Sequence, residues 1–457
     1  MSDTLQHMCV LRRSLSPFFV VLALLLAACG GEPTPLPEDA VPDAASAIAK
    51  PNSALGSERV TLRMLTWTQR GLDIDYSKTI AAFEAAHPNV TVEIQKENGN
   101  YDSSLPGRLS AKDKRPDVFH VNPYMLNALI AAGQVLDVAP LLRMSDSMPK
   151  DWVPGLLEIG KRGEAQYAIP LGWNPYYMLI NTDIFEKSKQ SLPESDWTID
   201  QFIEMAARLT DRSDAARPIF GVGFETNAFG SDASVMSFLM SNEGARWFRE
   251  GKSNFSDTAA VLGLQHMQDI YARDRSAPSR EDLTKLGVPT WLLWNRGMVA
   301  MMPVARAALP FFTRGAKHKW KVLELPRGRT RVNPYFVPHM LAVHPTTQHP
   351  DLALELVYAM LSTEAQLAAV KAGLRLPPLM SQMSDPALVD ANVADADLAR
   401  ATAAYHGDPS QLDLMQSSSA ETLIGEIIDP QLRLLFSGAQ SAEVTGRKID
   451  ELVTQKK

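Results

Sequence analysis

From Val60 onward, the sequence switches repeatedly between the period of a strand and the period of a helix. Strand-like stretches alternate apolar and polar residues, whereas helix-like stretches repeat apolar residues every three or four positions. The first kind occupies residues 60–65, 90–94 and 117–121, and the second kind occupies 77–87 and 124–132. Strands that alternate with helices imply a mainly parallel sheet covered on both faces, which binds ligands beyond the carboxyl ends of its strands.

Capping residues predict where individual helices begin. Ser77 is a candidate cap for the first helix, and Thr198 with Gln201 has the spacing of a capping box. Residues 351–370 are expected to form two helices divided at Ser362-Thr363, with Gln366 completing a second capping box. The 457 residues, of which 45% are hydrophobic, suffice for about two or three domain-sized units.

The beginning of the chain has the order of a secretory signal. Arg12 and Arg13 precede eleven uncharged apolar residues, 18–28, which are too few for a membrane span of about 20. The sequence LAAC at residues 26–29 resembles the lipobox of bacterial lipoproteins. We therefore predict a lipoprotein signal peptide at 1–28 and lipidation of Cys29. The alternative is an ordinary secretion signal with an incidental cysteine, and export by Sec or by Tat stays open.

The segment that follows the signal is predicted to be a disordered tether at residues 29–58. It contains five prolines and almost no aromatic or branched residues, so it has little to bury. Cleavage before Cys29 also removes Cys9, which leaves no partner for an intrachain disulfide. Loss of Asp3 and the two signal arginines removes a net +1 from the formal charge of −7, leaving −8. This mildly acidic balance argues against a nucleic-acid partner.

The sequence lacks the usual motifs of catalytic, nucleotide-binding and metal sites. No Gly-x-x-x-x-Gly-Lys loop, Gly-x-Ser-x-Gly elbow or His-Glu-x-x-His helix occurs. His339, His344 and His349 are spaced by five residues, which suits neither one helix face nor a familiar metal pattern. We interpret these histidines as scattered loop residues, and we expect no catalytic residue, no metal and no cofactor.

Seven phrases follow one another along nearly the whole mature chain in a family-like order. They are TLRMLTWTQRG, IAAFEAAHPNVTVEI, RPDVFHVNPYMLNALIAAGQVLDVAPLL, YAIPLGWNPYYMLINTDIFEK, DWTIDQFIEMAARLT, LLWNRGMVAMMPVA and PHMLAVHPTTQHPDLALELVYAMLSTEAQ. Together they resemble the extracellular solute-binding proteins of ABC importers, in the carbohydrate-type family that includes maltose-binding protein. Three departures bear on the identity of the ligand: Thr182 replaces a usual Lys, Trp294-Asn295 replaces a Phe-centred phrase, and GLRLPP lacks a familiar Pro-Thr-Arg.

The resemblance implies a two-lobed α/β fold of the periplasmic-binding-protein type, with a multi-crossing hinge and a cleft between the lobes. We expect lobe I at 59–171 and 327–372, and lobe II at 172–326 and 373–457. Such a protein captures a sugar or oligosaccharide by hinge closure and delivers it to a permease with two membrane subunits and a separate ATPase. We expect a non-enzymatic monomer, lipid-anchored to the outer face of the cytoplasmic membrane.

The candidate ligand-binding residues follow predicted strands or lie at predicted crossings between lobes. Aromatic rings fit the C–H faces of a sugar, and amides, carboxylates and Arg fit its hydroxyls. The candidates are Trp67, Gln69, Asn122, Tyr124, Trp173, Asn174, Tyr176, Tyr177, Glu225, Asn227, Phe229, Arg306, Tyr335 and Arg375. For the aromatic residues the alternative is packing in the core or hinge, and for Arg306 it is an ordinary surface position.

Two other functions stay open at this point. The same fold could bind a non-sugar solute, such as a polyol phosphate, which calls for Arg and helix N-termini, or a polyamine, which calls for acids around aromatics. A lipid-anchored enzyme acting on glycans would need a pair of carboxylates in the cleft. The aromatic and amide cluster at 173–177 favours a neutral sugar over these alternatives.

Overall fold

The computed structural model describes residues 58–68, 74–98, 101–144, 148–224, 239–240, 242–249, 252–329, 336–383, 385, 388 and 423–456. The predicted signal peptide, Cys29 and nearly all of the tether lie outside these residues. Within them, no helix combines the length and the apolar character that a membrane crossing requires.

An eight-stranded mixed sheet runs through the molecule in the order β2-β1-β3-β12-β6-β10-β7, with β11 also paired to β6. The strands are β1 (Val60–Thr68), β2 (Val90–Asn98), β3 (Val118–Val121), β6 (Ile169–Asn181), β7 (Phe220–Val222), β10 (Val299–Ala305), β11 (Trp320–Leu323) and β12 (Phe336–Val343). Strand β1 is parallel to β2 and β3, and β12 is antiparallel to both β3 and β6. The mixed α/β fold that the sequence predicted is confirmed.

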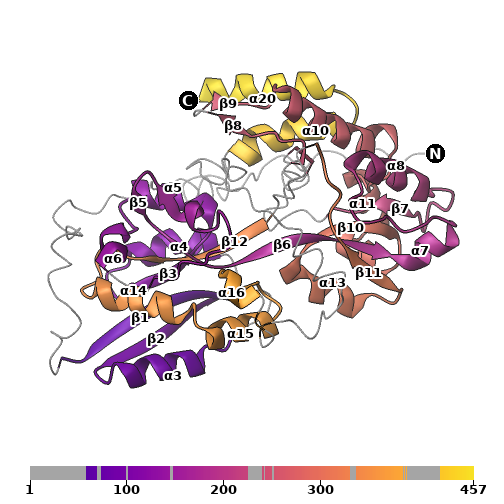
Figure 1. The fold of residues 1–457 in the computed structure, drawn as a ribbon. Helices are drawn as coiled ribbons and strands as arrows, with labels where there is room; N and C mark the ends of the chain where they lie inside the picture. Colours follow the sequence, from indigo (N-terminus) through magenta and orange to yellow (C-terminus); the bar gives the residue numbers. More distant parts are fainter. Residues whose placement is uncertain are drawn as a thin grey trace, which may run out of the picture.

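Strand β6 is 13 residues long and belongs to both halves of the sheet. Its first part, 169–175, pairs with β12, and its second part, 176–181, pairs with β10 and β11. Figure 1 shows β6 and β12 running between two bodies, which we call the first lobe (β1–β3 and their helices) and the second lobe (β7, β10, β11 and theirs). The long strand therefore carries the chain across the hinge between them.

Helices cover the sheet in both lobes. The first lobe contains α3 (Ser77–Ala86), α4 (Tyr101–Ser110), α5 (Pro123–Ala131), α6 (Ala139–Met144), α14 (Pro350–Ala359), α15 (Thr363–Lys371) and α16 (Met380–Met383). The second lobe contains α7 (Thr182–Lys187), α8 (Ile199–Leu209), α10 (Thr258–Gln268), α11 (Arg280–Leu286), α12 (Thr290–Asn295), α13 (Leu309–Gly315), α19 (Asp429–Phe436) and α20 (Ala442–Lys456). Shorter elements are β4 (Lys161–Arg162), β5 (Ala165–Gln166), β8 (Phe248–Arg249), β9 (Lys252–Ser253), η3 (Leu157–Gly160), η4 (Asp269–Arg273), η5 (Arg306–Ala308) and η8 (Ile424–Ile428).

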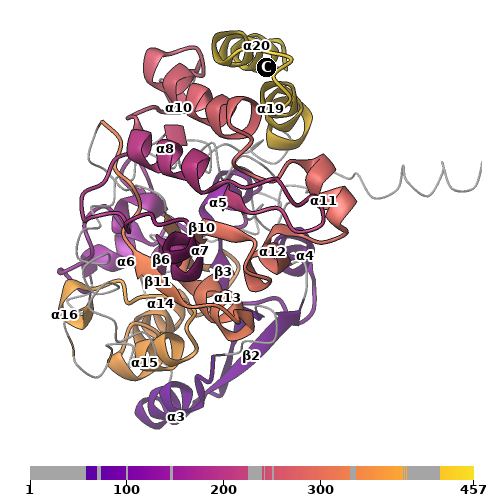
Figure 2. The same ribbon diagram turned by 90° about the vertical axis from the view of Figure 1, so that its right-hand side faces the viewer.

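Each lobe has its own hydrophobic core. In the first lobe, Met64 of β1 and Leu341 of β12 are buried together with the helices that cover them. In the second lobe, Phe202 of α8 shares a core with Ile449 of α20. Figure 2 shows α19 and α20 beside α10, at the opposite end of the molecule from α3. The C-terminal helices thus complete the second lobe, although no sequence pattern had predicted them.

Of the three predictions about helix starts, the Thr198 capping box is confirmed, the Ser77 cap is wrong, and the division of residues 351–370 into two helices is confirmed without its capping box. Gln201 N donates to Thr198 Oγ1 (3.2 Å) and Thr198 N to Gln201 Oε1 (2.8 Å), which is the predicted capping box. Helix α3 is capped instead at Tyr76, and the N–H of Ser77 donates to an Asp75 carboxylate oxygen.

The capping box expected at Gln366 does not form, because its side chain has other partners. The buried amide nitrogen of Gln366 donates to the carbonyls of Leu171 (3.2 Å) and Met360 (2.7 Å), and its amide oxygen does not accept from the start of its own helix. Ser362 caps α15 by accepting from Ala365 N. Gln366 therefore ties α15 to the strand that crosses the hinge.

The interpretation of the histidines as scattered loop residues holds for His344 and His349 but is wrong for His339. His339 lies within β12 and His344 directly follows it, and both side chains are buried. His349 caps α14. Within the described parts of the chain, no group of three or more His, Cys, Asp or Glu residues could hold a metal ion. His339 is thus part of a packed strand, and it becomes important below.

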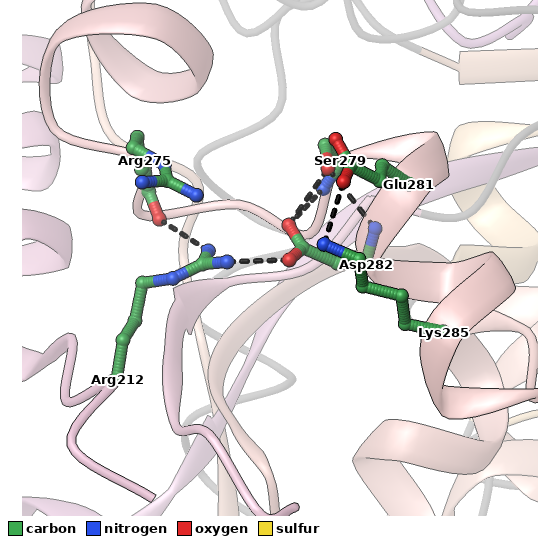
Figure 3. A network of polar contacts seen from close by, with 6 residues as sticks. All are labelled: Arg212, Arg275, Ser279, Glu281, Asp282 and Lys285. Carbon is green, nitrogen blue, oxygen red and sulfur yellow. Dashed lines mark hydrogen bonds and ion pairs between the residues drawn. The ribbon is translucent and has the colours of Figure 1, made fainter. Parts of the chain in front are cut away.

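A polar network fixes α11 to the rest of the second lobe (Figure 3). Asp282 accepts from both the N–H (2.9 Å) and the hydroxyl (2.8 Å) of Ser279, which closes a capping box. The guanidinium of Arg212 donates to Asp282 and also to the carbonyl of Arg275 (3.3 Å). One carboxylate therefore joins the helix start to two neighbouring loops.

The Asp282→Asn variant is expected to lose about 1–2 kcal/mol of stability at pH 7, because an amide replaces a charged acceptor in a cap and an ion pair. Burial raises the pKa of Asp282, but hydrogen bonds from Arg212 and Ser279 outweigh it and hold that pKa below its usual value. At pH values above the ordinary Asp pKa, the carboxylate makes its full contribution to the stability of the fold. This contribution is lost as the pH falls through the lowered pKa that Asp282 has in the folded protein. Urea unfolding at pH 7 and pH 3 should show the difference between the proteins shrinking in acid. Glu281→Gln, an exposed neighbour in Figure 3, is the control and should show little change at either pH.

Candidate functional site

Trp67 lies near the carboxyl end of β1, where a parallel sheet presents its ligand site. The indole is half-buried and stacks on the imidazole of His339, with ring centroids 5.8 Å apart and planes inclined by 18°. His339 comes from β12, which crosses from the second lobe and pairs with β3 and β6. An aromatic platform therefore forms where strands of the first lobe meet a crossing strand.

Asn174 and His120 add polar atoms to this platform. The amide nitrogen of Asn174 lies 2.8 Å from His339 Nε2, and the rings of His120 and His339 are 6.5 Å apart. Asn174 Oδ1 and His120 Nε2 are both buried, and neither has a hydrogen-bond partner in the part of the chain that the structure describes. Buried polar atoms are ordinarily satisfied, so two such atoms beside a half-exposed indole indicate a place for a polar ligand.

The two imidazoles of this group are neutral near pH 7. Burial, followed by the charge of Arg375, lowers the pKa of His339 to about 3. Burial, Arg375 and His339 likewise hold the pKa of His120 well below its usual value. Each neutral ring carries one donor nitrogen and one acceptor nitrogen, which suits hydroxyl groups better than charged groups.

Arg375 packs against the crossing strand, directly beside this group. Its side chain is 1% exposed and donates through Nε to the Leu171 carbonyl (3.2 Å) and through Nη2 to the Tyr76 hydroxyl (3.0 Å). The side chain lies so close to Gly172 that a Cβ atom there would be 2.5 Å from Arg375 Cδ. Glycine at position 172 is therefore needed for Arg375 to reach its place.

The remaining aromatic residues of the predicted crossing cluster differ in exposure. Trp173 is 2% exposed, packs in the first-lobe core and donates its indole N–H to the Pro377 carbonyl (3.0 Å). Tyr177 is buried in the second-lobe core. In this conformation neither ring presents a face to a solute. Tyr176 is half-buried and packs against the second-lobe core, next to the point where β6 changes partners.

A second polar group forms at the start of α5. The amide of Asn122 donates to Asp102 Oδ1 (2.7 Å) and to the Tyr124 hydroxyl (3.1 Å), and Tyr124 donates to the other oxygen of Asp102. Burial raises the pKa of Asp102 against the opposing effect of these bonds. Tyr124 belongs to the first lobe but packs against the core of the second. Its ring therefore bridges the two lobes.

Arg306 is placed differently from a surface arginine. It begins η5 directly after β10, is 1% exposed, and follows Ala305, which pairs with Tyr176 on the crossing strand.

Five other predicted site residues lie outside the described residues: Gln69, Glu225, Asn227, Phe229 and Tyr335.

Sequence reasoning missed three residues of these groups: His120, His339 and Asp102. Asp102 stands in the first turn of a helix that follows β2, and this position after a strand was an available signal. His120 sits inside a strand that the sequence did predict, one residue before its end. A polar residue within a fully buried strand, so near the ligand-binding edge of the sheet, could have identified it.

Comparisons with known proteins agree with this architecture. The sequence profile described as bacterial extracellular solute-binding protein matches residues 74–367, which is more than half of the chain. No curated protein matches the chain in sequence.

Solved structures with the same fold align with most of this chain. An ABC substrate-binding protein from Listeria monocytogenes in complex with cycloalternan has a TM-score of 0.70 at 16% identity, over 87% of this chain and 99% of that one. The sugar-binding protein MalE from Xanthomonas citri has a TM-score of 0.70 at 17% identity, over 86% and 96%. UgpB from Mycobacterium tuberculosis in complex with glycerophosphocholine has a TM-score of 0.68 at 14% identity, over 88% and 98%. The profile match, together with this shared two-lobed fold, makes the chain a member of the bacterial extracellular solute-binding protein family.

Proposed function

We propose that the protein is the substrate-binding component of an ABC importer and captures a sugar or oligosaccharide by closing its two lobes. The observation that carries this proposal is the Trp67–His339 stack beside the unpartnered atoms Asn174 Oδ1 and His120 Nε2. An indole face suits the C–H face of a sugar ring, and neutral amide and imidazole groups suit its hydroxyls. The structural neighbours that bind cycloalternan or are named sugar-binding proteins support this ligand class.

Hinge closure is the proposed mechanism of capture. A ligand drives closure only if it binds the closed form more tightly than the open form. Trp67, Asn174 and His339 lie where β6 and β12 cross between lobes, so a solute held there can contact both sides. Tyr124, which already reaches the second-lobe core, is proposed to close over the solute. The chain itself makes and breaks no covalent bond.

The lobe boundaries are proposed with two changes from the sequence expectation. Leu376 and Met383 pack against the first-lobe core, and Trp152 forms a bridge with Leu379, so we assign residues 373–383 to lobe I rather than to lobe II. The backbone of Arg327 bonds to Trp197 and Ile199, so we assign residues 327–329 to lobe II, before β12 crosses into lobe I. We keep 59–171 and 336–372 in lobe I and 172–326 with the C-terminal helices in lobe II, and strand β6 spans the boundary, since its Trp173 packs in the first-lobe core.

Outside the folded part, we propose an exported lipoprotein. Cys29 carries the lipid, and residues 30–58 tether the binding domain to the outer face of the cytoplasmic membrane. The monomer then presents its closed form to two membrane subunits served by a separate ATPase.

Thermal unfolding of the full chain against a panel of sugars and oligosaccharides tests the proposed function. A sugar at about 100 times its dissociation constant should add about 2.7 kcal/mol of stability. In Trp67→Ala, binding should weaken about tenfold or more because the stacking surface is lost, and Trp67→Phe should recover most of it. Trp320→Ala, which removes an exposed tryptophan of β11, is the matched control. If Trp67→Ala shows the same ligand-induced stabilisation as the wild type, the Trp67–His339 stack is not part of the binding site. If the oligosaccharides are converted to smaller sugars, the protein is an enzyme instead.

A further inference from the structure

Arg375 is a buried cation without an acidic partner among the described residues. Within the described ranges, its guanidinium donates only to neutral oxygens, namely the Leu171 carbonyl and the Tyr76 hydroxyl. No carboxylate in the described ranges forms an ion pair with it, although its side chain is 1% exposed. Buried charges are ordinarily paired, since desolvation of a lone charge is strongly unfavourable. The position therefore leaves a positive charge to be balanced.

The groups packed around Arg375 do not supply that balance. From β3 and β12 it faces His120 and His339, both of which burial and the Arg375 charge hold in the neutral form. Asn174, which contacts His339, is a neutral amide. Among the described residues, Arg375 is the charged side chain that acts on both imidazoles, and its positive charge lowers the pKa of each.

We infer that Arg375 pairs with an anionic group of the solute, so that the site takes a carbohydrate or polyol bearing a carboxylate or a phosphate. A planar guanidinium forms paired hydrogen bonds with either group, which adds direction to the attraction. The Trp67–His339 stack and the free atoms of Asn174 and His120 then hold the ring and hydroxyls. This inference rests on the proposed function and replaces the neutral sugar that the sequence favoured.

The position of Arg375 also connects anion binding with hinge motion. The side chain lies against Gly172 on the crossing strand and is covered in this conformation. Under the proposed hinge motion, an anion reaches Arg375 in the open form, and closure of the lobes then buries the ion pair. The pair is stronger in the closed form because the surroundings are drier, so it favours closure.

Matched ligands test this inference on the full chain by thermal unfolding. Glucose, galactose and glycerol are compared with glucuronate, galacturonate, glucose phosphate and glycerol phosphate, and inorganic phosphate alone shows what the anion contributes without a polyol. We expect at least one anionic member to bind about tenfold or more tightly than its neutral counterpart. The carboxylate and phosphate members distinguish the two possible anions.

Two variants separate charge from structure. Arg375→Gln should weaken binding of the anionic member far more than binding of its neutral counterpart, so that the preference disappears, and Arg375→Lys should retain part of the preference. A merely structural role predicts instead that both variants lower the unliganded melting temperature and weaken all ligands alike. Carboxylate binding should stay constant from pH 5.5 to 8, because Arg375 and not an imidazole supplies the charge.

The outcomes are distinguishable from failure of the proposed function. If neutral members bind as tightly as anionic ones, or if binding strengthens as the histidines protonate, the inference is wrong while sugar binding stands. If no member of the panel changes the melting temperature, both the inference and the proposed function are contradicted. Binding of inorganic phosphate that survives Arg375→Gln marks another anion site and also overturns the assignment.

Discussion

Replacement of Asp450 by alanine is expected to destabilise the second lobe by about 3 kcal/mol. One carboxylate of α20 accepts four hydrogen bonds from the turn after β9, from the hydroxyls of Ser253 and Ser256 and from the backbone N–H groups of Phe255 (2.9 Å) and Ser256 (2.8 Å). The Phe255 side chain is part of the second-lobe core. Alanine therefore leaves the N–H of Phe255 without its acceptor next to that core, removes all four bonds between the turn and α20, and loosens the C-terminal helix.

Urea unfolding of the variants measures this effect. Asp450→Asn should lie between the wild type and Asp450→Ala, because the amide keeps one acceptor oxygen. Glu451→Ala is the matched control: it removes the neighbouring carboxylate, which forms an exposed pair with Lys448, and should cost well under 1 kcal/mol. Equal stability of the Asp450→Ala and Glu451→Ala proteins would show that α20 is held by its apolar face alone.

Gly172→Ala is expected to cost about 3 kcal/mol and to abolish the response to ligand. An added Cβ would lie 2.6 Å from the Leu376 carbonyl oxygen as well as 2.5 Å from Arg375 Cδ. The carbonyl accepts from Trp173 N (3.1 Å), so it cannot move without breaking the bridge that holds residues 375–377 to β6. The variant must therefore displace Arg375 and open the hinge packing together.

Circular dichroism melts and the sugar panel should report both effects. Gly107→Ala is the matched control, because nothing lies within 4 Å of the added atom and position 107 is inside helix α4. Alanine there should raise stability by about 0.5–1 kcal/mol, since it restricts the unfolded chain and favours the helix. If the melting temperature of Gly172→Ala is unchanged, Arg375 and the Leu376 carbonyl can move away from the added methyl group without loss of stability. The packing at the crossing would then be looser than its contacts imply.

The sequence predicted those parts of the fold that short-range patterns determine. Alternation identified β1, β2 and β3, and the Thr198 capping box needed only two residues three positions apart. The cap at Gln366 failed because its amide bonds to Leu171, far away in the chain. Local patterns carry no information about such partners, so tertiary contacts override them.

The candidate site was predictable only in part, for the same reason. Trp67 was found because it ends a readable strand. Trp173 was predicted as a site residue because several aromatic residues lie close together in the sequence there. Its indole N–H instead donates to the Pro377 carbonyl, 204 positions later in the chain, and this contact accounts for its burial. His339 was dismissed because its spacing fits no motif. Its place in the candidate site depends on contacts with Trp67 and Asn174, which the fold brings to it from two other strands.

Small-angle X-ray scattering of the full chain, with and without a sugar that raises its melting temperature, tests the central claim most directly. If two lobes joined by β6 and β12 close on the solute, the radius of gyration should fall upon binding, and Trp67→Ala should require more sugar for the same fall. A sugar that binds and stabilises the protein while leaving the scattering curve unchanged would contradict capture by closure.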